Sequence, residues 1–241
     1  YNRDRFLRRI IVMTSSARGA RTAIVFDLDG TMVDSLPDIS DALNRTLAEF
    51  GRAPVAENSV RGWLGDGVSS LVDRGLKATG GMPSGMTLDS ATERFRHFYR
   101  GHTTVRSALF PNVETTLRRL KDNGHRLGVC TNKPFSLAME VVDGFGIASL
   151  FDAVLGGDSL DVRKPDPRHL TGTLAAMGVG DAPALMVGDS ANDVKTARAA
   201  GIPVVVMSFG YSAPPVAELG ADAVLDDFAA LLTLPGTLLT V

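Results

Sequence analysis

Residues 23–34 read AIVFDLDGTMVD and join a short apolar run to an acidic turn. The apolar run is typical of a buried strand, and the glycine after the second carboxylate is typical of a tight turn. A strand covered on both faces belongs to a parallel α/β sheet, so we expect Asp27 and Asp29 at the strand end where such sheets bind ligands. One carboxylate there can attack an electrophile or bind a hard cation while the other transfers protons. Acidic turns with glycine also occur in loops without function, so the stretch alone leaves both interpretations open.

The composition indicates an ordinary globular chain. Its 241 residues suit one large domain or two small ones, and 44% hydrophobic with 22% charged residues argues against disorder. A net charge of -2 gives no reason to expect nucleic acid. No apolar run reaches the roughly 18 residues of a membrane span. The single cysteine, Cys130, fits a reducing compartment, so we expect a cytoplasmic protein.

The order of apolar patterns predicts two structural regions. Residues 1–20 are interpreted as an N-terminal extension, disordered or partly a cloning remnant, with an amphipathic transit peptide as the alternative. Helical spacing without a strand pattern follows the acidic turn, so residues 35–108 are predicted to form an inserted all-helical subdomain. Residues 21–34 and 109–241 alternate between strands and helices. This alternation predicts an α/β fold with a Rossmann-like, doubly wound parallel sheet.

The later elements are predicted individually from the same patterns. The first helix of the insertion is expected over residues 37–50. The later strands are predicted at 126–130, 153–155, 184–187, 203–207 and 223–225. The helices between them are predicted at 113–123, 134–145, 167–177 and 192–200.

Three later segments place polar groups at or near strand ends. Thr131 and Asn132 follow the second strand, where a hydroxyl and turn amides can bind a phosphate oxygen. Lys164 precedes a proline in a later link, and Asp189 and Asp193 follow another strand. Each segment alone has an ordinary explanation as a turn, a solvated loop or a helix cap. Together they point to one site, because the carboxyl ends of parallel strands lie at one edge of a sheet.

These segments, in this order, resemble the four motifs of the haloacid dehalogenase superfamily of phosphotransferases. The first motif, DxDGTxxD, is filled at every position from Asp27 to Asp34, and GDSxxD of residues 188–193 resembles the last. The helical insertion between the first two motifs resembles a type 1 cap. Within the superfamily, the stretches DSLPDISDALN, GVCTNKP and GDSANDVKTARAAGIPVV are most similar to bacterial phosphoglycolate phosphatases.

The resemblance implies a phosphomonoester hydrolase that forms an aspartyl phosphate on Asp27, with 2-phosphoglycolate as the expected substrate. Asp29 would protonate the leaving alkoxide and then take a proton from the attacking water, a role that needs a carboxyl group shielded from solvent. Lys164 and Thr131 are also expected to act in catalysis, together with these two carboxylates. The residues that would hold phosphoryl oxygens or substrate are Leu28, Asp29, Thr131, Asn132 and Lys164.

The same resemblance implies Mg²⁺, held by side-chain oxygens of Asp27 and Asp189 and by the backbone carbonyl of Asp29. Magnesium prefers octahedral oxygen ligands and keeps several waters, which suits a few carboxylates. Asp193 either binds the metal through water or holds Lys164, and the sequence leaves both roles open.

Substrate specificity is expected to reside in the cap, which closes over the phosphate. A two-carbon carboxylate would need a cation or backbone amides near it, and Arg61 is the candidate, with a surface arginine as the ordinary alternative. The expected partner is a small phosphorylated metabolite, and the oligomeric state is not readable. One alternative to a 2-phosphoglycolate hydrolase is a phosphatase or phosphomutase that acts on a sugar phosphate, a nucleotide or pyrophosphate. An alternative of another class is a non-catalytic domain that binds Mg²⁺ and accepts phosphate.

Overall fold

The structure, a computed structural model, describes residues 22–234, so the predicted extension over residues 1–20 lies outside the described residues. The chain forms a six-stranded parallel sheet with strand order β5-β4-β1-β6-β7-β8. Its strands are β1 (Ala23–Phe26), β4 (Arg126–Cys130), β5 (Ala153–Leu155), β6 (Ala184–Gly188), β7 (Val204–Met207) and β8 (Ala223–Leu225). The predicted parallel α/β sheet is confirmed.

Strand β1 lies in the middle of the sheet, and the strand order reverses there. Phe26 at its end is in register with Val129 of β4 and with Val187 of β6. The segments that follow these three strands therefore leave the sheet at the same edge. A reversal of strand order opens a crevice at this edge, because the connections on its two sides cross to opposite faces of the sheet.

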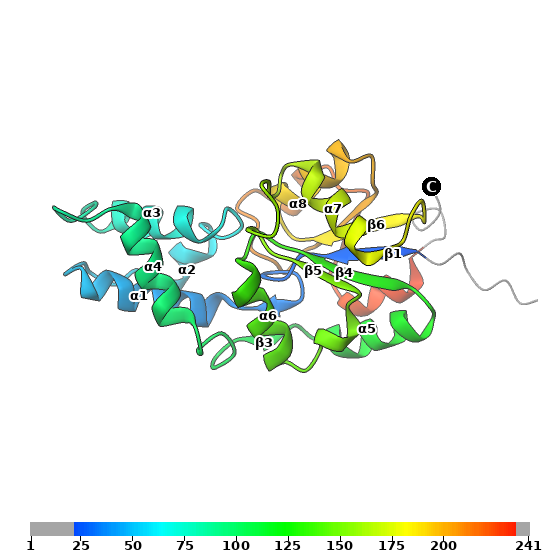
Figure 1. Ribbon diagram of the computed structural model, residues 1–241, viewed down its shortest axis with the longest axis horizontal. Coiled ribbons are helices and arrows are strands. Elements are labelled where there is room, and N and C mark those ends of the chain that lie inside the picture. Colours follow the sequence, from blue (N-terminus) through cyan, green and yellow to red (C-terminus); the bar gives the residue numbers. More distant parts are fainter. Residues whose placement is uncertain (1–21, 235–241) are drawn as a thin grey trace, which may run out of the picture.

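Helices cover both faces of the sheet (Figure 1). One face carries α5 (Val113–Asp122), α6 (Phe135–Gly144) and the 3₁₀ helix η3 (Phe228–Thr233), and the other carries α7 (Pro167–Met177) and α8 (Ala191–Ala199). Along β1, Ile24 and Phe26 pack into the first layer, while Ala23 and Val25 pack into the second. Both sets of side chains are buried, which explains the unbroken apolar run.

Four helices lie together beyond the carboxyl edge of the sheet (Figure 1), and we call them the cap helices. They are α1 (Leu36–Glu49), α2 (Glu57–Arg61), α3 (Val68–Ala78) and α4 (Leu88–Tyr99). Their apolar side chains form a second core that includes Leu43, Leu47, Leu76 and Phe95, and Leu137 of α6 joins it from the sheet side. A second core lets this unit keep its own packing while it rests on the sheet.

The two chain crossings between sheet and cap helices form a short ribbon that the sequence analysis missed. Strand β2 (Val33–Asp34) pairs antiparallel with β3 (Ala108–Leu109). Two residues are too few to display the alternation that identifies a strand, and the partner lies far along the sequence. Beside this ribbon, the carboxylate of Asp38 accepts hydrogen bonds from the backbone amides of Arg106 and Ser107. The entry and exit crossings are therefore tied together.

Among the described residues, no helix has the length and apolar character needed to cross a membrane.

Candidate active site

The acidic turn after β1 is held against the neighbouring strand β6. The amide of Asp27 donates to the carbonyl of Val187 at 2.9 Å, and the amide of Leu28 donates to Asp27 Oδ1 at 2.7 Å. Gly30 has a φ of +82°, and a Cβ atom there would lie 2.3 Å from Asp189 Oδ2. Only glycine fits this position, because the backbone is left-handed and a buried carboxylate lies directly against it. The turn and the carboxylate after β6 are therefore packed as one unit.

Three buried carboxylates meet at this point. Asp27, Asp189 and Asp193 each offer a carboxylate oxygen within 4.8 Å of the others. The backbone amide of Tyr211 orients Asp189 by donating to its Oδ2 at 2.6 Å, and the hydroxyl of Thr31 lies 3.3 Å from its Oδ1. The cluster contains only oxygen donors, which are the ligands that hard divalent cations such as Mg²⁺ prefer.

Lys164 bridges two of these carboxylates from the interior. Its Nζ lies 3.0 Å from Asp27 Oδ1 and 2.6 Å from Asp193 Oδ1, and its side chain is 1% exposed. Asp193 Oδ2 accepts three further hydrogen bonds, from the amides of Asp189 and Ser190 and from the hydroxyl of Ser190. Both oxygens of Asp193 are thus engaged by the protein, which favours the role of holding Lys164 over direct binding of a metal.

Burial and neighbouring charges shift the pKa values of Asp27, Asp189 and Lys164. Burial raises the pKa of Asp27 to about 6, with Lys164 opposing this rise and Asp193 adding to it. Burial, followed by repulsion from Asp193 and Asp27, raises the pKa of Asp189 well above its usual range. Burial by itself lowers the pKa of Lys164, but Asp193 and Asp27 outweigh it and the net shift is upward. When all three carboxylates are ionised, one ammonium leaves two negative charges uncompensated, and a divalent cation would compensate them, so the residues fit such an ion.

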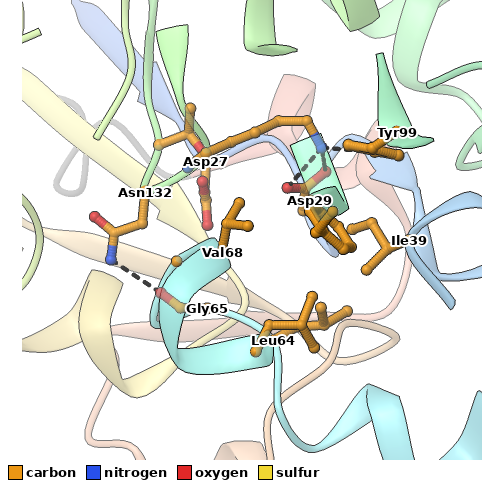
Figure 2. A pocket seen from close by; sticks show the side chains of 13 residues that line it. Asp27, Asp29, Ile39, Leu64, Gly65, Val68, Tyr99 and Asn132 are labelled. Atoms are coloured by element: carbon orange, nitrogen blue, oxygen red, sulfur yellow. Dashed lines mark hydrogen bonds and ion pairs between the residues drawn. The ribbon is translucent and has the colours of Figure 1, made fainter. Parts of the chain in front are cut away.

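The turn after β4 faces the acidic turn (Figure 2). Thr131 is buried, and its hydroxyl accepts a hydrogen bond from the amide of Lys133 at 3.3 Å. The side-chain amide of Asn132 donates to the carbonyl of Gly65 in the loop before α3 and to the carbonyl of Lys164, at 2.9 and 3.0 Å. Asn132 therefore connects this turn both to the cap helices and to the loop that carries Lys164.

A small cavity of about 50 Å³ lies between the sheet edge and the cap helices. Its polar wall comes from the sheet side and consists of Asp27, Asp29, Thr131, Asn132 and Lys133. Its apolar wall comes from the cap helices and their loops and consists of Ile39, Leu64, Val68, Leu71, Phe95 and Tyr99. The volume corresponds to roughly four water molecules, so it suits a compact ligand. The charged groups face apolar side chains that limit the access of water.

Arg61 is not brought to this cavity. Its guanidinium donates to the carbonyl of Gly210 at 2.7 Å and lies 5.2 Å above the ring of Tyr211. Arg61 instead joins α2 to the loop after β7, and it is not among the residues that line the cavity. The sequence could not reveal this, because the contact depends on how the cap helices rest on the core.

Sequence reasoning missed Lys133, which lies on the cavity wall. Its Nζ is 2.9 and 3.1 Å from the two carboxylate oxygens of Asp29 and 2.8 Å from the hydroxyl oxygen of Tyr99. Burial by itself lowers the pKa of Lys133, but Asp29 and Tyr99 outweigh it and the net shift is upward. The only signal in the sequence was a lysine two residues after Thr131, and most lysines at such turns are solvated.

Comparison with known proteins agrees with this geometry. The chain matches the model of the family described as haloacid dehalogenase-like hydrolase over residues 24–207. It is 48% identical over 213 residues to a phosphoglycolate phosphatase of Rhodospirillum rubrum, covering 87% of this chain and 88% of that one. A phosphoglycolate phosphatase of Caulobacter vibrioides is 41% identical over 217 residues, covering 90% and 92%. The crystal structure of a predicted phosphoglycolate phosphatase from Haemophilus somnus 129pt superposes with a TM-score of 0.84 at 35% identity, covering 88% and 97%.

Proposed function

The chain belongs to the haloacid dehalogenase-like hydrolases and is a phosphatase, and from this we propose that it hydrolyses 2-phosphoglycolate to glycolate and phosphate with Mg²⁺. The observation that carries the proposal is a buried Asp27, paired with Lys164 and two further carboxylates, at the polar wall of a small cavity. The choice of 2-phosphoglycolate as the substrate rests on the relatives named above, which are phosphoglycolate phosphatases. We further propose that residues 35–108 are a cap on the core of residues 21–34 and 109–241.

Asp27 is the proposed nucleophile. Its Oδ1 is held by Lys164 and by the amide of Leu28, whereas its Oδ2 has no hydrogen-bond partner among the described residues. Oδ2 can therefore attack phosphorus, forming an aspartyl phosphate as the bond to the leaving oxygen breaks. Lys164 neutralises charge between the carboxylate and the phosphoryl group, which otherwise repel each other.

Asp29 is the proposed acid and base. It lies one residue beyond Leu28 in the same turn and on the same cavity wall as Asp27. It would give a proton to the leaving alkoxide in the first step and take one from the attacking water in the second. The hydroxyl of Thr131 and the amides of Leu28 and Asn132 would hold phosphoryl oxygens during both steps.

The proposed Mg²⁺ ligands are the side chains of Asp27 and Asp189 and the backbone carbonyl of Asp29. When bound, the ion would neutralise charge on the phosphoryl group and on the carboxylates around it. Asp193 would position Lys164, to which its Oδ1 is bonded at 2.6 Å. The apolar side chains of the cap helices would keep bulk water from the phosphorylated Asp27.

The first test is phosphate release from a substrate panel, with Mg²⁺ and with a chelator. The panel contains 2-phosphoglycolate, sugar phosphates, nucleoside monophosphates and pyrophosphate. We expect the highest kcat/KM for 2-phosphoglycolate, and only with Mg²⁺, because the relatives named above are phosphoglycolate phosphatases. Highest activity on a sugar phosphate or a nucleotide would contradict the proposed substrate but would still agree with a phosphatase. Full activity in chelator would contradict the proposed metal.

Thermal unfolding tests the metal without reference to activity. Excess Mg²⁺ should raise the Tm of the wild-type chain by about 5 °C or more, because an ion that binds only the folded state stabilises it. Asp189→Asn should show little or no shift with Mg²⁺. In chelator, however, the variant should be at least as stable as the wild type, since the amide removes one of three crowded negative charges.

The advantage of Asp189→Asn in chelator should also depend on pH. The folded-state pKa of Asp27 is raised from 3.8 to about 6, and that of Asp189 is also raised. Each group therefore stabilises the folded state fully below its unfolded pKa, and this contribution is lost as the pH rises through its folded pKa, which is about 6 for Asp27. The difference in Tm between variant and wild type should be small at pH 4 and larger above pH 6.

In the Mg²⁺ experiment, an equal increase in Tm in both proteins would contradict the assignment of Asp189 as a metal ligand.

A further inference from the structure

Lys133 is the one cation among the described residues that line the cavity. Its side chain is 3% exposed and lies at the turn after β4, beside the groups proposed to hold the phosphoryl oxygens. The second buried lysine of the site, Lys164, does not line the cavity, since it lies behind Asp27 and bonds Asp27 and Asp193. The two lysines therefore occupy different places, one behind the nucleophile and the other facing the ligand space.

The pairing of Lys133 with Asp29 is not needed to compensate the buried cluster. The Asp29 side chain is 21% exposed, whereas Asp189 and Asp193 are almost completely buried. Asp29 also lies outside the group of three carboxylates that come within metal-binding distance of one another. A buried ammonium must keep an anionic partner, and an anion of the ligand can replace a partly exposed carboxylate without leaving the ammonium unpaired.

Tyr99 holds the ammonium in place from the opposite side. Its hydroxyl oxygen, at the end of cap helix α4, lies 2.8 Å from Lys133 Nζ, and the ammonium lies 4.6 Å from the centre of its ring. Both contacts survive if Lys133 changes its anionic partner, because neither involves Asp29. They also connect the cation to the cap helices, so its position depends on how these helices pack against the core.

We propose that Lys133 is the specificity-determining residue for the leaving group, and that it binds a carboxylate carried by the leaving alcohol in exchange for Asp29. This inference rests on the proposed phosphatase reaction. When the carboxylate of the substrate takes the ammonium, the Asp29 side chain is released and can turn toward the leaving oxygen. An ester without an anionic group leaves Asp29 bound to Lys133. The substrate class is then a phosphate monoester of a hydroxy acid, with the carboxylate near enough to the leaving oxygen to reach Lys133 in place of Asp29.

The test compares two esters with the same two-carbon chain, 2-phosphoglycolate and 2-hydroxyethyl phosphate, which has a neutral hydroxymethyl group in place of the carboxylate. Phosphate release gives kcat/KM for each ester and hence their ratio. The wild-type ratio should favour 2-phosphoglycolate, and Lys133→Met should lower it by about 30-fold or more, as expected for loss of one partner of a buried charge pair. Lys133→Gln, which keeps a hydrogen-bonding group but not the charge, should lower it similarly. Lys133→Gln also allows the ratio to be measured if Lys133→Met does not fold.

Two further variants separate this role from others. Lys77→Met removes the same charge from a cap side chain that is 72% exposed and paired with Asp73, and it should leave the ratio unchanged. Tyr99→Phe should lower the ratio several-fold, because it removes the hydrogen bond that holds the ammonium.

The outcomes distinguish this inference from the proposed function. An equal loss on both esters in the Lys133 variants would overturn the inference, because the lysine would then act only through Asp29. A wild-type ratio near one would overturn it as well, while the release of phosphate would still support the phosphatase. No release from either ester by the wild type would overturn the proposed function and the inference together.

Discussion

Asp27→Asn should lose phosphate release by about 10⁴-fold or more in kcat/KM, the largest effect expected of any substitution in this chain. The amide cannot form the acyl phosphate, so the reaction has no covalent route. The fold should persist, because the amide oxygen can still accept from Leu28 and because Lys164 keeps its bond to Asp193. Burial raises the pKa of Asp27 to about 6, so a neutral side chain at this position is well tolerated.

The measurement is phosphate release over a range of substrate concentrations, which gives kcat/KM, together with thermal unfolding of both proteins. Asp143→Asn, an exposed position on α6, is the matched control and should retain full activity. Activity of Asp27→Asn within tenfold of the wild type, with no hydrolysis of the amide back to aspartate, would contradict the role of Asp27 as nucleophile.

Asp29→Asn should lower steady-state turnover by about 10³-fold, within the range expected for loss of general acid and base catalysis. The most informative substrate is p-nitrophenyl phosphate, whose leaving group needs no acid. With it, the variant should release about one equivalent of nitrophenol in a burst and then stall. The stall follows because nothing takes the proton from the water that attacks the phosphorylated Asp27.

Intact-mass measurement during the stall should detect covalent phosphate on Asp29→Asn. The double variant Asp27→Asn/Asp29→Asn is the control and should carry none. Steady turnover close to that of the wild type, without a burst, would show that Asp29 transfers no proton in the rate-limiting step. A burst that also occurs in the double variant would mean that the phosphate resides on another residue.

The α/β core was largely predictable because its signals are local. Residues 126–130, 153–155, 167–177 and 223–225 have the bounds predicted from apolar runs and turn residues. The other predicted core elements differ by one residue at one or both ends, as in α8, which spans Ala191–Ala199 rather than residues 192–200. A run that is apolar on both faces can only be buried between two layers, and this requirement restricts the topology.

The ribbon of β2 and β3 was missed for the opposite reason. Each strand has two residues, and the hydrogen bonds join segments that lie far apart along the chain. Propensity is a property of neighbouring residues, so it carries no information about a pairing of this kind. The 3₁₀ helix η3 was also missed, since its apolar residues are as compatible with a strand or a loop.

The sequence by itself determined the parallel sheet and the four segments that converge at its carboxyl edge, because strand ends in one sheet must meet there. Only the tertiary structure decided what the charged side chains contact. It separated Arg61, which binds the loop at Gly210, from Lys133, which faces Asp29 and Tyr99 across the cavity. It also gave both oxygens of Asp193 protein partners. The physical reason is that a long side chain can reach many partners from one backbone position, so burial and the packing of the cap helices select among them.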